Sequence, residues 1–507
     1  MDAAAKAATG ISGLDAVLGG GLPRNWIYLV QGTPGTGKTT LGLQFLLEGL
    51  RVGERVLYIT LSHTERELNE IAESHGWSLD KMPIHEFSAG EAVAYITSEQ
   101  TVFHTADVEL KETTDAILEA VTRTGPARLV FDPIEQIRLL TDSPLRYRSQ
   151  LLTFKQALSD LECTTLFLTG EPEAQSDRQL GTLAHGALVL EQRAPDYGDV
   201  RRRLKVDKGR GMRYRGGYHS FRIRTGGLEV FPRLETPAST SGGAGQRTVV
   251  KSGVGELDNL LGGGLEGGTA CLLVGPTGTG KSTLATLYAH TAAARGERAA
   301  VFLFDERPET FHARSQGMGL DLKPQLEAGT VRLQQVDAGE LSPGEFAHTV
   351  REAVGEGGAK VVVIDSLTGY LNAMPQETLL VAQLHELLTY LSWKGVLTLL
   401  IMAERGVLGS GDLEPLDVSY LADTVLLLRH FEAEGRLRLA VSVIKKRYGP
   451  HETTIRELRI TPAGIQVGDP ITMFSGVLTG APTYEGRAEG LFASDGQDDD
   501  RADRGND

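Results

Sequence analysis

The chain contains the same eight-residue pattern twice, Gly-x-x-x-x-Gly-Lys followed by Thr or Ser. The first copy occupies 32–39 and the second 275–282, so that Lys38 and Lys281 are 281 − 38 = 243 positions apart. Because 507 residues suffice for two domains of ordinary size, this spacing predicts a duplicated domain. The segments before the two copies match at the same offset, 10–15 with 253–258 and 19–22 with 262–265.

Both halves of the chain alternate short apolar runs, typical of strands, with helical patterns. Continuous apolar strands between helices indicate a parallel sheet that is buried on both faces. We therefore predict the α/β class, with two tandem domains that each contain a mostly parallel sheet flanked by helices. The runs expected to be strands are 26–30, 55–60 and 128–132 in the first half and 270–274, 299–304 and 361–365 in the second.

Changes in composition along the chain predict where the domains begin and end. We predict a first domain at 1–233 and a second at 248–485, joined by a flexible linker at 234–247 that is rich in Gly, Ser, Thr and Pro. The remaining segment, 486–507, is acidic and poor in apolar residues, so we predict a disordered tail there.

Charge and cysteine content argue against several classes of function. The net charge of −15 gives no general attraction to nucleic acid or to anionic membranes. No apolar run approaches the roughly 18 residues of a membrane helix, so no membrane association is expected. Cys163 and Cys271 lie within apolar runs and have no disulfide or zinc spacing, which favours core packing and a reducing, cytoplasmic location.

The repeated pattern is that of a phosphate-binding loop. Its glycines let backbone N–H groups turn toward phosphate oxygens, and the helix that follows offers its positive N-terminal end. In each copy the lysine would reach the β- and γ-phosphates of ATP, and the next hydroxyl would bind Mg²⁺. The predicted ATP-binding residues of the loops are Gly32, Thr33, Pro34, Gly35, Thr36, Gly37, Lys38, Thr39 and Thr40 in the first copy, and Gly275, Pro276, Thr277, Gly278, Thr279, Gly280, Lys281, Ser282 and Thr283 in the second.

A site of this kind also needs a carboxylate on the metal side. Asp132 and Asp365 each end an apolar strand after the loop, which is where an Asp associated with Mg²⁺ is expected. An Asp at the end of a strand is also a common turn former or helix cap, and this alternative stays open. The predicted metal-side residues are Thr39 and Asp132 in the first copy, and Ser282 and Asp365 in the second.

The two copies differ where the attacking nucleophile must be oriented or deprotonated. The second strand of the second domain runs into Asp305 and Glu306, two carboxylates, and the offset of 243 maps them onto Ser62 and His63. A serine does not act as a base near neutral pH without help, and a neutral histidine lacks the negative charge that holds a water beside phosphates. An acidic pair here is alternatively a solvated helix start.

Taken together, these residues resemble the KaiC family, tandem RecA-like ATPases and autokinases that include the cyanobacterial clock protein. The resemblance extends from Thr9 to about Pro482. It rests on the matched segments before each loop, on both loops, on Asp305 and Glu306, and on late segments of the second domain. Those late segments are Ser419-Tyr420-Leu421-Ala422-Asp423-Thr424, Lys445-Lys446-Arg447-Tyr448-Gly449-Pro450-His451-Glu452 and Ile455-Arg456-Glu457-Leu458.

The resemblance implies a homo-oligomer, a hexameric double ring with ATP bound between neighbouring subunits. It implies that Glu306 activates the nucleophile with support from Asp305. It also implies that a late basic strand reaches the neighbour's nucleotide, where cations would stabilise charge on the γ-phosphate. The residues that match this strand are Lys445, Arg447 and His451 in the second domain, and Lys208 and Arg210 in the first; a basic surface strand is the alternative.

The chain departs from the family in several places. Ser419 and Tyr420 occupy the positions of the neighbouring Ser and Thr that are phosphorylated in KaiC, which makes Ser419 the candidate phosphoacceptor; a helix cap or a buried hydroxyl is its alternative role. The segment 474–482 resembles the family's C-terminal loop region and is where we expect a signalling or clock-type partner. The acidic tail has no ready match, so a clock function does not follow.

We therefore predict a Mg²⁺-dependent ATPase and serine/threonine autokinase with divided labour. The first domain binds ATP mainly for ring assembly, and the second is catalytic. One alternative is a DNA-transacting RecA relative, for which the basic run from Arg201 to Arg215, with Tyr214 and Tyr218, is the supporting feature. Another is a non-enzymatic signalling scaffold that assembles with ATP; the acidic pair argues against it.

Overall fold

The computed structural model describes residues 6–87, 105–140, 143–170, 177–195, 198–235, 248–337, 339–372, 380–404, 419–433, 435–478 and 483–484. Most of the predicted linker (236–247) and the whole predicted acidic tail (486–507) lie outside the described residues. The chain divides into two compact units. The first takes in 1–237, 337–352 and 373–387, and the second 238–336, 353–372 and 388–507.

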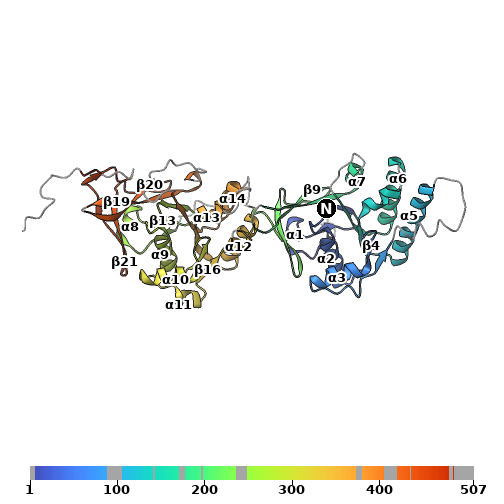
Figure 1. Ribbon diagram of the computed structural model, residues 1–507, viewed down its shortest axis with the longest axis horizontal. Helices are drawn as coiled ribbons and strands as arrows, with labels where there is room; N and C mark the ends of the chain where they lie inside the picture. The colour runs from blue at the N-terminus through green and yellow to red at the C-terminus, as the bar shows by residue number, and fades with distance from the viewer. Residues whose placement is uncertain are drawn as a thin grey trace, which may run out of the picture. The chain divides into compact units, whose positions relative to one another are not determined.

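The first unit is built on a nine-stranded sheet (Figure 1). The strands of that sheet are β3 (Ile27–Gln31), β4 (Val56–Thr60), β5 (Ile84–Glu86), β6 (Arg128–Asp132), β7 (Thr164–Thr169), β8 (Gly186–Arg193), β9 (Arg201–Gly209), β10 (His219–Arg224) and β11 (Gly227–Phe231). Two short strands, β1 (Lys6–Ala7) and β2 (Leu22–Pro23), pair with each other in a separate sheet. Its helices are α1 (Ser12–Val17), α2 (Lys38–Arg51), α3 (Glu65–Ser74), α5 (Thr105–Thr124), η1 (Ile134–Leu140), α6 (Pro144–Asp160) and α7 (Asp177–Leu183).

The second part of the chain repeats this plan. Its strands are β12 (Val249–Val250), β13 (Leu265–Glu266), β14 (Ala270–Gly275), β15 (Arg298–Leu303), β16 (Val331–Gln335), β17 (Ala359–Asp365), β18 (Leu397–Ala403), β19 (Thr424–Ala433), β20 (Arg436–Lys446), β21 (Arg456–Thr461), β22 (Gly464–Pro470), β23 (Phe474–Ser475) and β24 (Thr483–Tyr484). Its helices are α8 (Gly255–Leu260), α9 (Lys281–Ala294), α10 (Pro308–Gly317), α11 (Lys323–Glu327), α12 (Pro343–Gly355), α13 (Leu367–Asn372), α14 (Leu380–Trp393) and η2 (Ser419–Leu421).

The two large sheets have the same strand order. The first reads β5-β4-β6-β7-β3-β8-β9-β10-β11 and the second β16-β15-β17-β18-β14-β19-β20-β21-β22. In each, the strands up to β8 or β19 are parallel, and an antiparallel extension follows. The prediction of two mostly parallel sheets flanked by helices is thereby confirmed. Because the parallel strands end at the same edge, the residues after β3, β4, β6 and β7 meet there.

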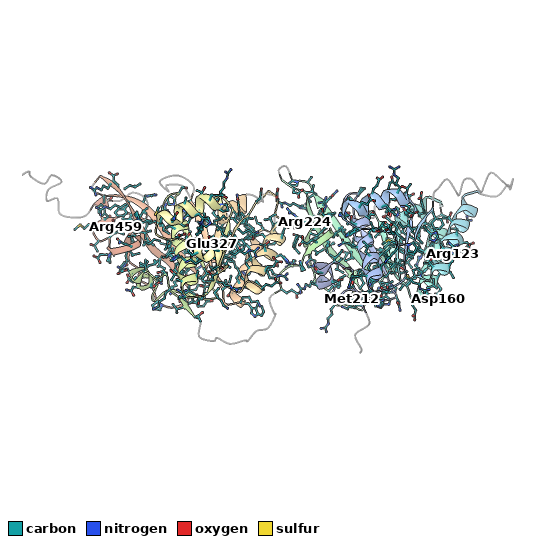
Figure 2. All side chains as sticks on the ribbon, turned by 90° about the horizontal axis from the view of Figure 1, so that it is seen from below. Arg123, Asp160, Met212, Arg224, Glu327 and Arg459 are labelled. Carbon is teal, nitrogen blue, oxygen red and sulfur yellow. The ribbon has the colours of Figure 1, made fainter. Side chains whose placement is uncertain are left out.

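Side-chain alternation explains why the strands are apolar throughout. In β3, Tyr28 and Val30 belong to the buried cluster that contains Phe45 of α2, whereas Leu29, which points to the opposite face, belongs to the cluster that contains Phe154 of α6. Cys163 and Cys271 are free and buried in these apolar runs, as predicted. The described side chains are drawn in Figure 2.

No described helix is long and apolar enough to cross a membrane.

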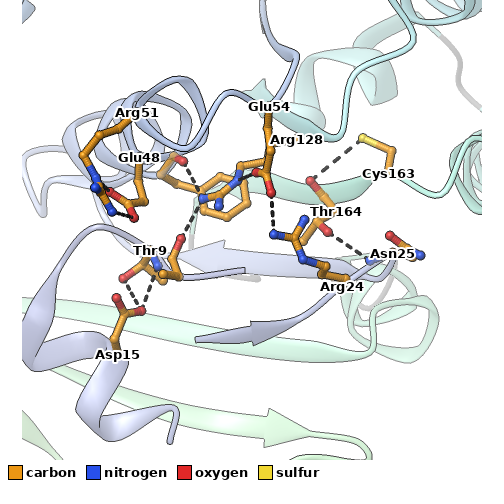
Figure 3. Close-up of polar contacts among 12 residues, drawn as sticks. Thr9, Asp15, Arg24, Asn25, Glu48, Arg51, Glu54, Arg128, Cys163 and Thr164 are labelled. Atoms are coloured by element: carbon orange, nitrogen blue, oxygen red, sulfur yellow. Dashed lines mark hydrogen bonds and ion pairs between the residues drawn. The ribbon is translucent and has the colours of Figure 1, made fainter. Parts of the chain in front are cut away.

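The motif at 10–15, repeated at 253–258, has a structural role. The Asp15 carboxylate accepts hydrogen bonds from the backbone N–H (2.7 Å) and the hydroxyl (2.8 Å) of Thr9, which fixes the turn before α1 (Figure 3). Asp258 accepts the same two bonds from Ser252, both at 2.8 Å. The repeated motif therefore anchors the segment that precedes each sheet.

A buried arginine ties the start of the first unit to the loop helix. The guanidinium of Arg128, which is 1% exposed, donates to the carbonyls of Ala8 (2.6 Å) and Phe45 (2.9 Å) (Figure 3). It also pairs with Glu54, which pairs in addition with Arg24. Since a buried charge must be paired, these contacts make Arg128 a structural residue. The strand register places Val361 at the equivalent position of the second sheet, so this network belongs to the first unit alone.

Candidate nucleotide sites

Both phosphate loops follow the central strand of their sheet and lead directly into a helix. Gly37 and Gly280 precede α2 and α9 with φ angles of 93° and 85°, a conformation that favours glycine. At the first glycine of each loop there is no room for a side chain: a Cβ would lie 2.5 Å from the Leu190 carbonyl oxygen at Gly32, and 2.1 Å from that of Leu428 at Gly275. The loops therefore have the tight backbone that a phosphate cradle needs, and the residues present fit ATP. We refer to the first loop and its surroundings as site one, and to the second as site two.

The loop lysines lie in matching positions. Lys38 Nζ donates to the carbonyls of Gly32 (2.6 Å) and Thr33 (3.2 Å), and Lys281 Nζ donates to those of Gly275 (2.8 Å) and Pro276 (2.6 Å). Burial lowers the pKa of both lysines, against the opposing effect of nearby carboxylates, and the pKa of Lys281 falls to about 8. A buried cation that loses hydration is stabilised by an anion, so each lysine favours phosphate binding.

The other loop residues shape the backbone or continue the helix. The hydroxyl of Thr36 donates to the Thr33 carbonyl (2.8 Å), as that of Thr279 does to Pro276 (2.9 Å). These bonds close the loops internally. Pro34, Gly35, Thr277 and Gly278 form the outer part of the loops, and Thr40 and Thr283 lie in the first turn of α2 and α9.

At site two the two predicted metal-side residues lie together. Asp365 ends β17 beside the loop and is hydrogen bonded by Ser282; burial raises its pKa, and Ser282 and Arg314 oppose that rise. Asp305, just after β15, accepts a bond of 2.5 Å from Ser366, the residue that follows Asp365. A hydroxyl and a carboxylate in this arrangement are suited to Mg²⁺ bound together with nucleotide phosphates.

Glu306 also lies at this edge of the sheet. Both of its carboxylate oxygens are bonded by Arg314 of α10, Oε1 at 3.1 Å and Oε2 at 2.9 Å. The Glu306 side chain is 20% exposed, which leaves it accessible to a small molecule. Site two therefore has the Glu306 carboxylate beside the loop, where Arg314 fixes its position.

At site one the metal-side carboxylate has more partners. Asp132 Oδ2 accepts hydrogen bonds from Thr39 Oγ1 (2.8 Å) and from the phenol of Tyr58 (2.6 Å). The pKa of Tyr58 is raised well above its ordinary value by burial, so the phenol remains a donor. The offset places Val301 at the position of Tyr58 in the second copy, so site two lacks this bond.

The residues that replace the acidic pair at site one contact each other. Ser62 Oγ lies 3.0 Å from His63 Nδ1, and the same nitrogen lies 4.0 Å from Asp132 Oδ2. Another carboxylate lies nearby: Glu135 of η1 acts electrostatically on Lys38 and accepts a bond of 2.9 Å from the backbone of Gly170. Site one therefore differs from site two in two ways. It lacks the acidic pair, and the additional carboxylate near its lysine comes from Glu135 of η1.

The late basic residues lie at the opposite end of the sheets from the loops of their own copies. Lys208 Nζ donates to the carbonyls of Gly181 and Ala184 (2.7 Å for Ala184), and Lys445 Nζ to those of Ser419 (3.1 Å) and Ala422 (2.8 Å). Both lysines thus bind the ends of the short helices before β8 and β19. Neither is near the loop of its own sheet, since β8 and β19 run parallel to the strands that lead into the loops.

Arg447, Arg210 and His451 share this location. Arg447 donates to the Tyr420 carbonyl (2.8 Å) and contacts Asp423 (3.3 Å). The backbone N–H of Arg210 bonds the His185 carbonyl (2.9 Å), just as that of Arg447 bonds Asp423 (2.9 Å). His451 follows β20, beside Glu452, whose N–H bonds the Leu260 carbonyl (3.0 Å). The structure therefore gathers the predicted basic residues into one region of each sheet.

Ser419, the candidate phosphoacceptor, is exposed in η2 at the same end. The turn is fixed to the start of β14 because the Asp423 N–H bonds the Ala270 carbonyl (2.8 Å). The loop begins at Gly275, the far end of that strand, about 17 Å away at roughly 3.3 Å per residue. Ser419 is thus separated from site two of its own chain.

Sequence reasoning missed four residues at these sites: Tyr58, Glu135, Arg314 and Glu404. The last directly follows β18, where its backbone N–H bonds the Gly275 carbonyl (3.1 Å), and its carboxylate forms an ion pair with the buried Arg429 (2.5 Å). A usable signal existed for two of them. At the offset of 243, Tyr58 corresponds to a valine and Arg314 to an isoleucine, and such unlike pairs mark where the copies diverge.

The basic run on β9 has partners within its own sheet. The Arg203 guanidinium lies 4.0 Å from the centre of the Tyr218 ring and pairs with Glu191 (2.7 Å), which also accepts a bond from the Tyr218 hydroxyl (2.6 Å). Because both the ring and the cation are engaged, this pair does not offer the free aromatic surface that single-stranded DNA stacks on.

Comparison with known proteins places the chain in a family. The family described as "ATPase: KaiC" matches residues 7–235 and 250–471, so it covers each sheet once. The chain belongs to the KaiC ATPase family. The resemblance stated from sequence is thereby confirmed, and the two sheets are those of tandem RecA-like α/β domains.

Individual KaiC proteins resemble the chain over nearly its full length. A circadian clock protein KaiC3 of Synechocystis sp. is 25% identical over 508 residues, covering 97% of this chain and 98% of that protein. The circadian clock oscillator protein KaiC of Thermostichus vulcanus is 26% identical over 505 residues, covering 94% and 92%. That of Synechococcus elongatus is 26% identical over 499 residues, covering 95% and 92%. These likenesses support a KaiC-like ATP-binding ATPase.

Proposed function

We propose that site two hydrolyses ATP with Mg²⁺ and that site one binds ATP mainly to hold an oligomer together. The observation that carries this proposal is the held Glu306 carboxylate beside loop two, at a position where site one has His63. The loops themselves are alike, so the difference lies in the chemistry after binding.

In the proposed reaction, Glu306 orients a water and takes its proton as the water oxygen bonds to the γ-phosphorus. The bond between that phosphorus and the β–γ bridging oxygen breaks, giving ADP and phosphate. Lys281 and the N-terminus of α9 stabilise the negative charge on the phosphates. Ser282 and Asp365 would hold Mg²⁺, which supplies further positive charge when bound. Asp305 supports the site through Ser366.

Site one keeps the loop, Lys38, Thr39 and Asp132 but lacks the acidic pair. Its Asp132 is shared between Thr39 and Tyr58. Binding energy at this site is therefore available for assembly without turnover, since a ligand that binds only the assembled form stabilises that form. Lys208 and Arg210 of one copy are proposed to face the nucleotide of the next, in a ring that the family likeness suggests is a hexameric double ring.

We further propose that Ser419 accepts a phosphoryl group from site two of a neighbouring copy. Its separation from the site in its own chain supports transfer between copies, and Lys445 binds the Ser419 carbonyl (3.1 Å). Lys445, Arg447 and His451 are then positioned at the nucleotide that donates the phosphate. A signalling or clock-type partner at 474–482 completes the proposal; residues 479–482 lie outside the described part of the chain.

The test is Glu306→Gln, which keeps the shape of the side chain but removes its charge. We expect ATP turnover, measured as phosphate release, to fall at least about a hundredfold while ATP binding is retained. Glu309→Gln is the matched control, because Glu309 is an exposed carboxylate in the first turn of α10. Full turnover in the Glu306 variant would show that another group activates the water.

The kinase part of the proposal has a separate test. Incubation with γ-labelled ATP and peptide mapping should place the label on the peptide that contains Ser419. Mixing a Lys281→Ala chain with a Ser419→Ala chain should restore label on Ser419 of the first, because donor and acceptor belong to different copies. Labelling at another residue, or none in the wild type, would exclude Ser419 as the acceptor.

A further inference from the structure

Arg314 holds the candidate base in a two-pronged contact. Its Nε and NH2 nitrogens donate to the two carboxylate oxygens of Glu306, at 3.1 and 2.9 Å. The two side chains are 22% and 20% exposed, so water screens the pair only in part. A contact through both oxygens fixes the rotation of the carboxylate as well as its position, which a single hydrogen bond does not do.

Arg314 is itself held from two further directions. Its guanidinium lies 5.1 Å from the centre of the Phe311 ring, within the range of a cation–π contact, and Phe311 is buried. Its NH1 nitrogen lies 3.4 Å from Thr283 Oγ1, in the first turn of the helix that follows loop two. The guanidinium therefore connects the Glu306 carboxylate to the core on one side and to the loop on the other.

The contact leaves Glu306 able to act. A carboxylate has about four lone-pair sites, and the guanidinium occupies two of them. The remaining sites are available to accept a proton from water, so the arginine orients the carboxylate without consuming its capacity as a base.

The two copies of the domain support a role tied to Glu306. At the offset of 243, Glu306, Phe311 and Arg314 correspond to His63, Leu68 and Ile71. In the first unit Leu68 is buried and Ile71 packs against the core, so the helix tolerates hydrocarbon at both positions. The fold does not require an arginine there. The arginine and its aromatic support occur in the copy that has the glutamate, and both are replaced in the copy that lacks it.

We propose that Arg314, supported by Phe311, is the positioning residue for Glu306 in ATP hydrolysis at site two. The inference rests on the proposed function, because it takes Glu306 as the base. Arg314 acts through the carboxylate and takes no part in bond making. Its contribution is to hold the carboxylate in one orientation before water is attacked, which lowers the cost of reaching the transition state.

The experiment measures kcat and KM for ATP in Arg314→Met, Arg314→Lys and Phe311→Leu chains. Arg314→Met keeps the stem and should lower kcat about tenfold to a hundredfold, with KM changed less than threefold. Arg314→Lys keeps the charge but loses the fork, so we expect it to recover only part of that loss. Phe311→Leu should lower kcat about threefold. Arg295→Met, which removes an exposed pair with Glu297 elsewhere on the second unit, is the control and should leave kcat unchanged.

A double variant separates positioning from structure. Adding Arg314→Met to Glu306→Gln should leave the residual turnover within twofold, because a residue that acts through Glu306 has nothing to act on once its charge is gone. A full additional loss in the double variant would overturn the proposal, as would an unchanged kcat in Arg314→Met or a loss that lies in KM. These outcomes differ from failure of the proposed function, in which Glu306→Gln itself retains turnover. Thermal unfolding of each variant with ATP bound shows whether the fold is intact. We expect it to be intact, because the first unit folds with Leu68 and Ile71 at the corresponding positions.

Discussion

The buried lysine of site two predicts how ATP binding responds to pH. Burial lowers the pKa of Lys281 from its ordinary 10.5 to about 8, although Asp365 and Glu404 oppose the shift. In the complex, phosphates surround the amine with negative charge and keep it protonated. ATP binding to site two must therefore take up a proton wherever the free lysine is neutral, and affinity should weaken as the pH rises through 8.

The size of the effect follows from the pKa. An amine with a pKa of about 8 is charged in about 90% of molecules at pH 7 and in about 10% at pH 9. The affinity of site two for ATP should consequently fall about tenfold over this range, or about 1.4 kcal/mol. ATP itself changes little in charge here, since the second ionisation of a phosphate group lies near pH 6.

Calorimetry tests this directly. Titration of a Lys38→Ala chain with a non-hydrolysable ATP analogue isolates site two, and repeating it at pH 9 in buffers of different ionisation enthalpy counts the protons taken up. We expect close to one proton per site at pH 9 and about 0.1 at pH 7. Equal affinities at pH 7 and 9, with no proton uptake, would refute the view that burial in the loop has lowered the lysine's pKa.

Three further predictions concern the first unit. Arg128→Met should lower the free energy of unfolding of this unit by about 3 kcal/mol, measured in urea. This is the low end for a broken buried ion pair, because Glu54 remains paired with Arg24. The control, Arg66→Met, removes an exposed ion pair and should change the free energy of unfolding little. Tyr58→Phe removes a buried bond to a carboxylate and should cost about 1.5–3 kcal/mol in the same assay; an unchanged midpoint would show that the bond adds nothing. Lys38→Ala should weaken ATP-dependent assembly, measured by analytical ultracentrifugation, more than it lowers turnover per assembled particle; the reverse order would contradict a division of labour.

Much of the fold was predictable because local pattern and repetition agree. Apolar runs between helices required strands buried on two faces, and the observed β6 begins and ends where the sequence placed it, at Arg128 and Asp132. The repeated loop pattern identified Lys281 and Ser282, and the apolar strand that ends at Asp365 identified the carboxylate; all three meet at one site, since parallel strands end at the same edge. The segment before each loop was recognised only as a repeat, and its capping role needed the contacts of Asp15 and Asp258.

The sequence could not reveal which residues from separate elements touch. Arg314 lies eight positions after Glu306 on another element, and nothing in local pattern says that its guanidinium turns back to that carboxylate. Tyr58 reads as one more apolar strand residue until the neighbouring β6 places Asp132 beside its hydroxyl. Such pairs depend on strand register and on the angle at which a helix leaves the sheet, and both are set by packing of the whole domain.

What the sequence determined and what the tertiary structure decided differ for a physical reason. By itself, the sequence determined that two phosphate loops exist and that only the second copy keeps an acidic pair, because a loop and its adjoining strand are contiguous. Tertiary structure decided the surroundings of those residues. It placed Ser419 at the opposite end of the sheet from its own loop, gave Asp132 the hydroxyl of Tyr58, and gave Glu306 the guanidinium of Arg314. Charge and orientation at a site depend on neighbours in space, which the chain brings together only when it folds.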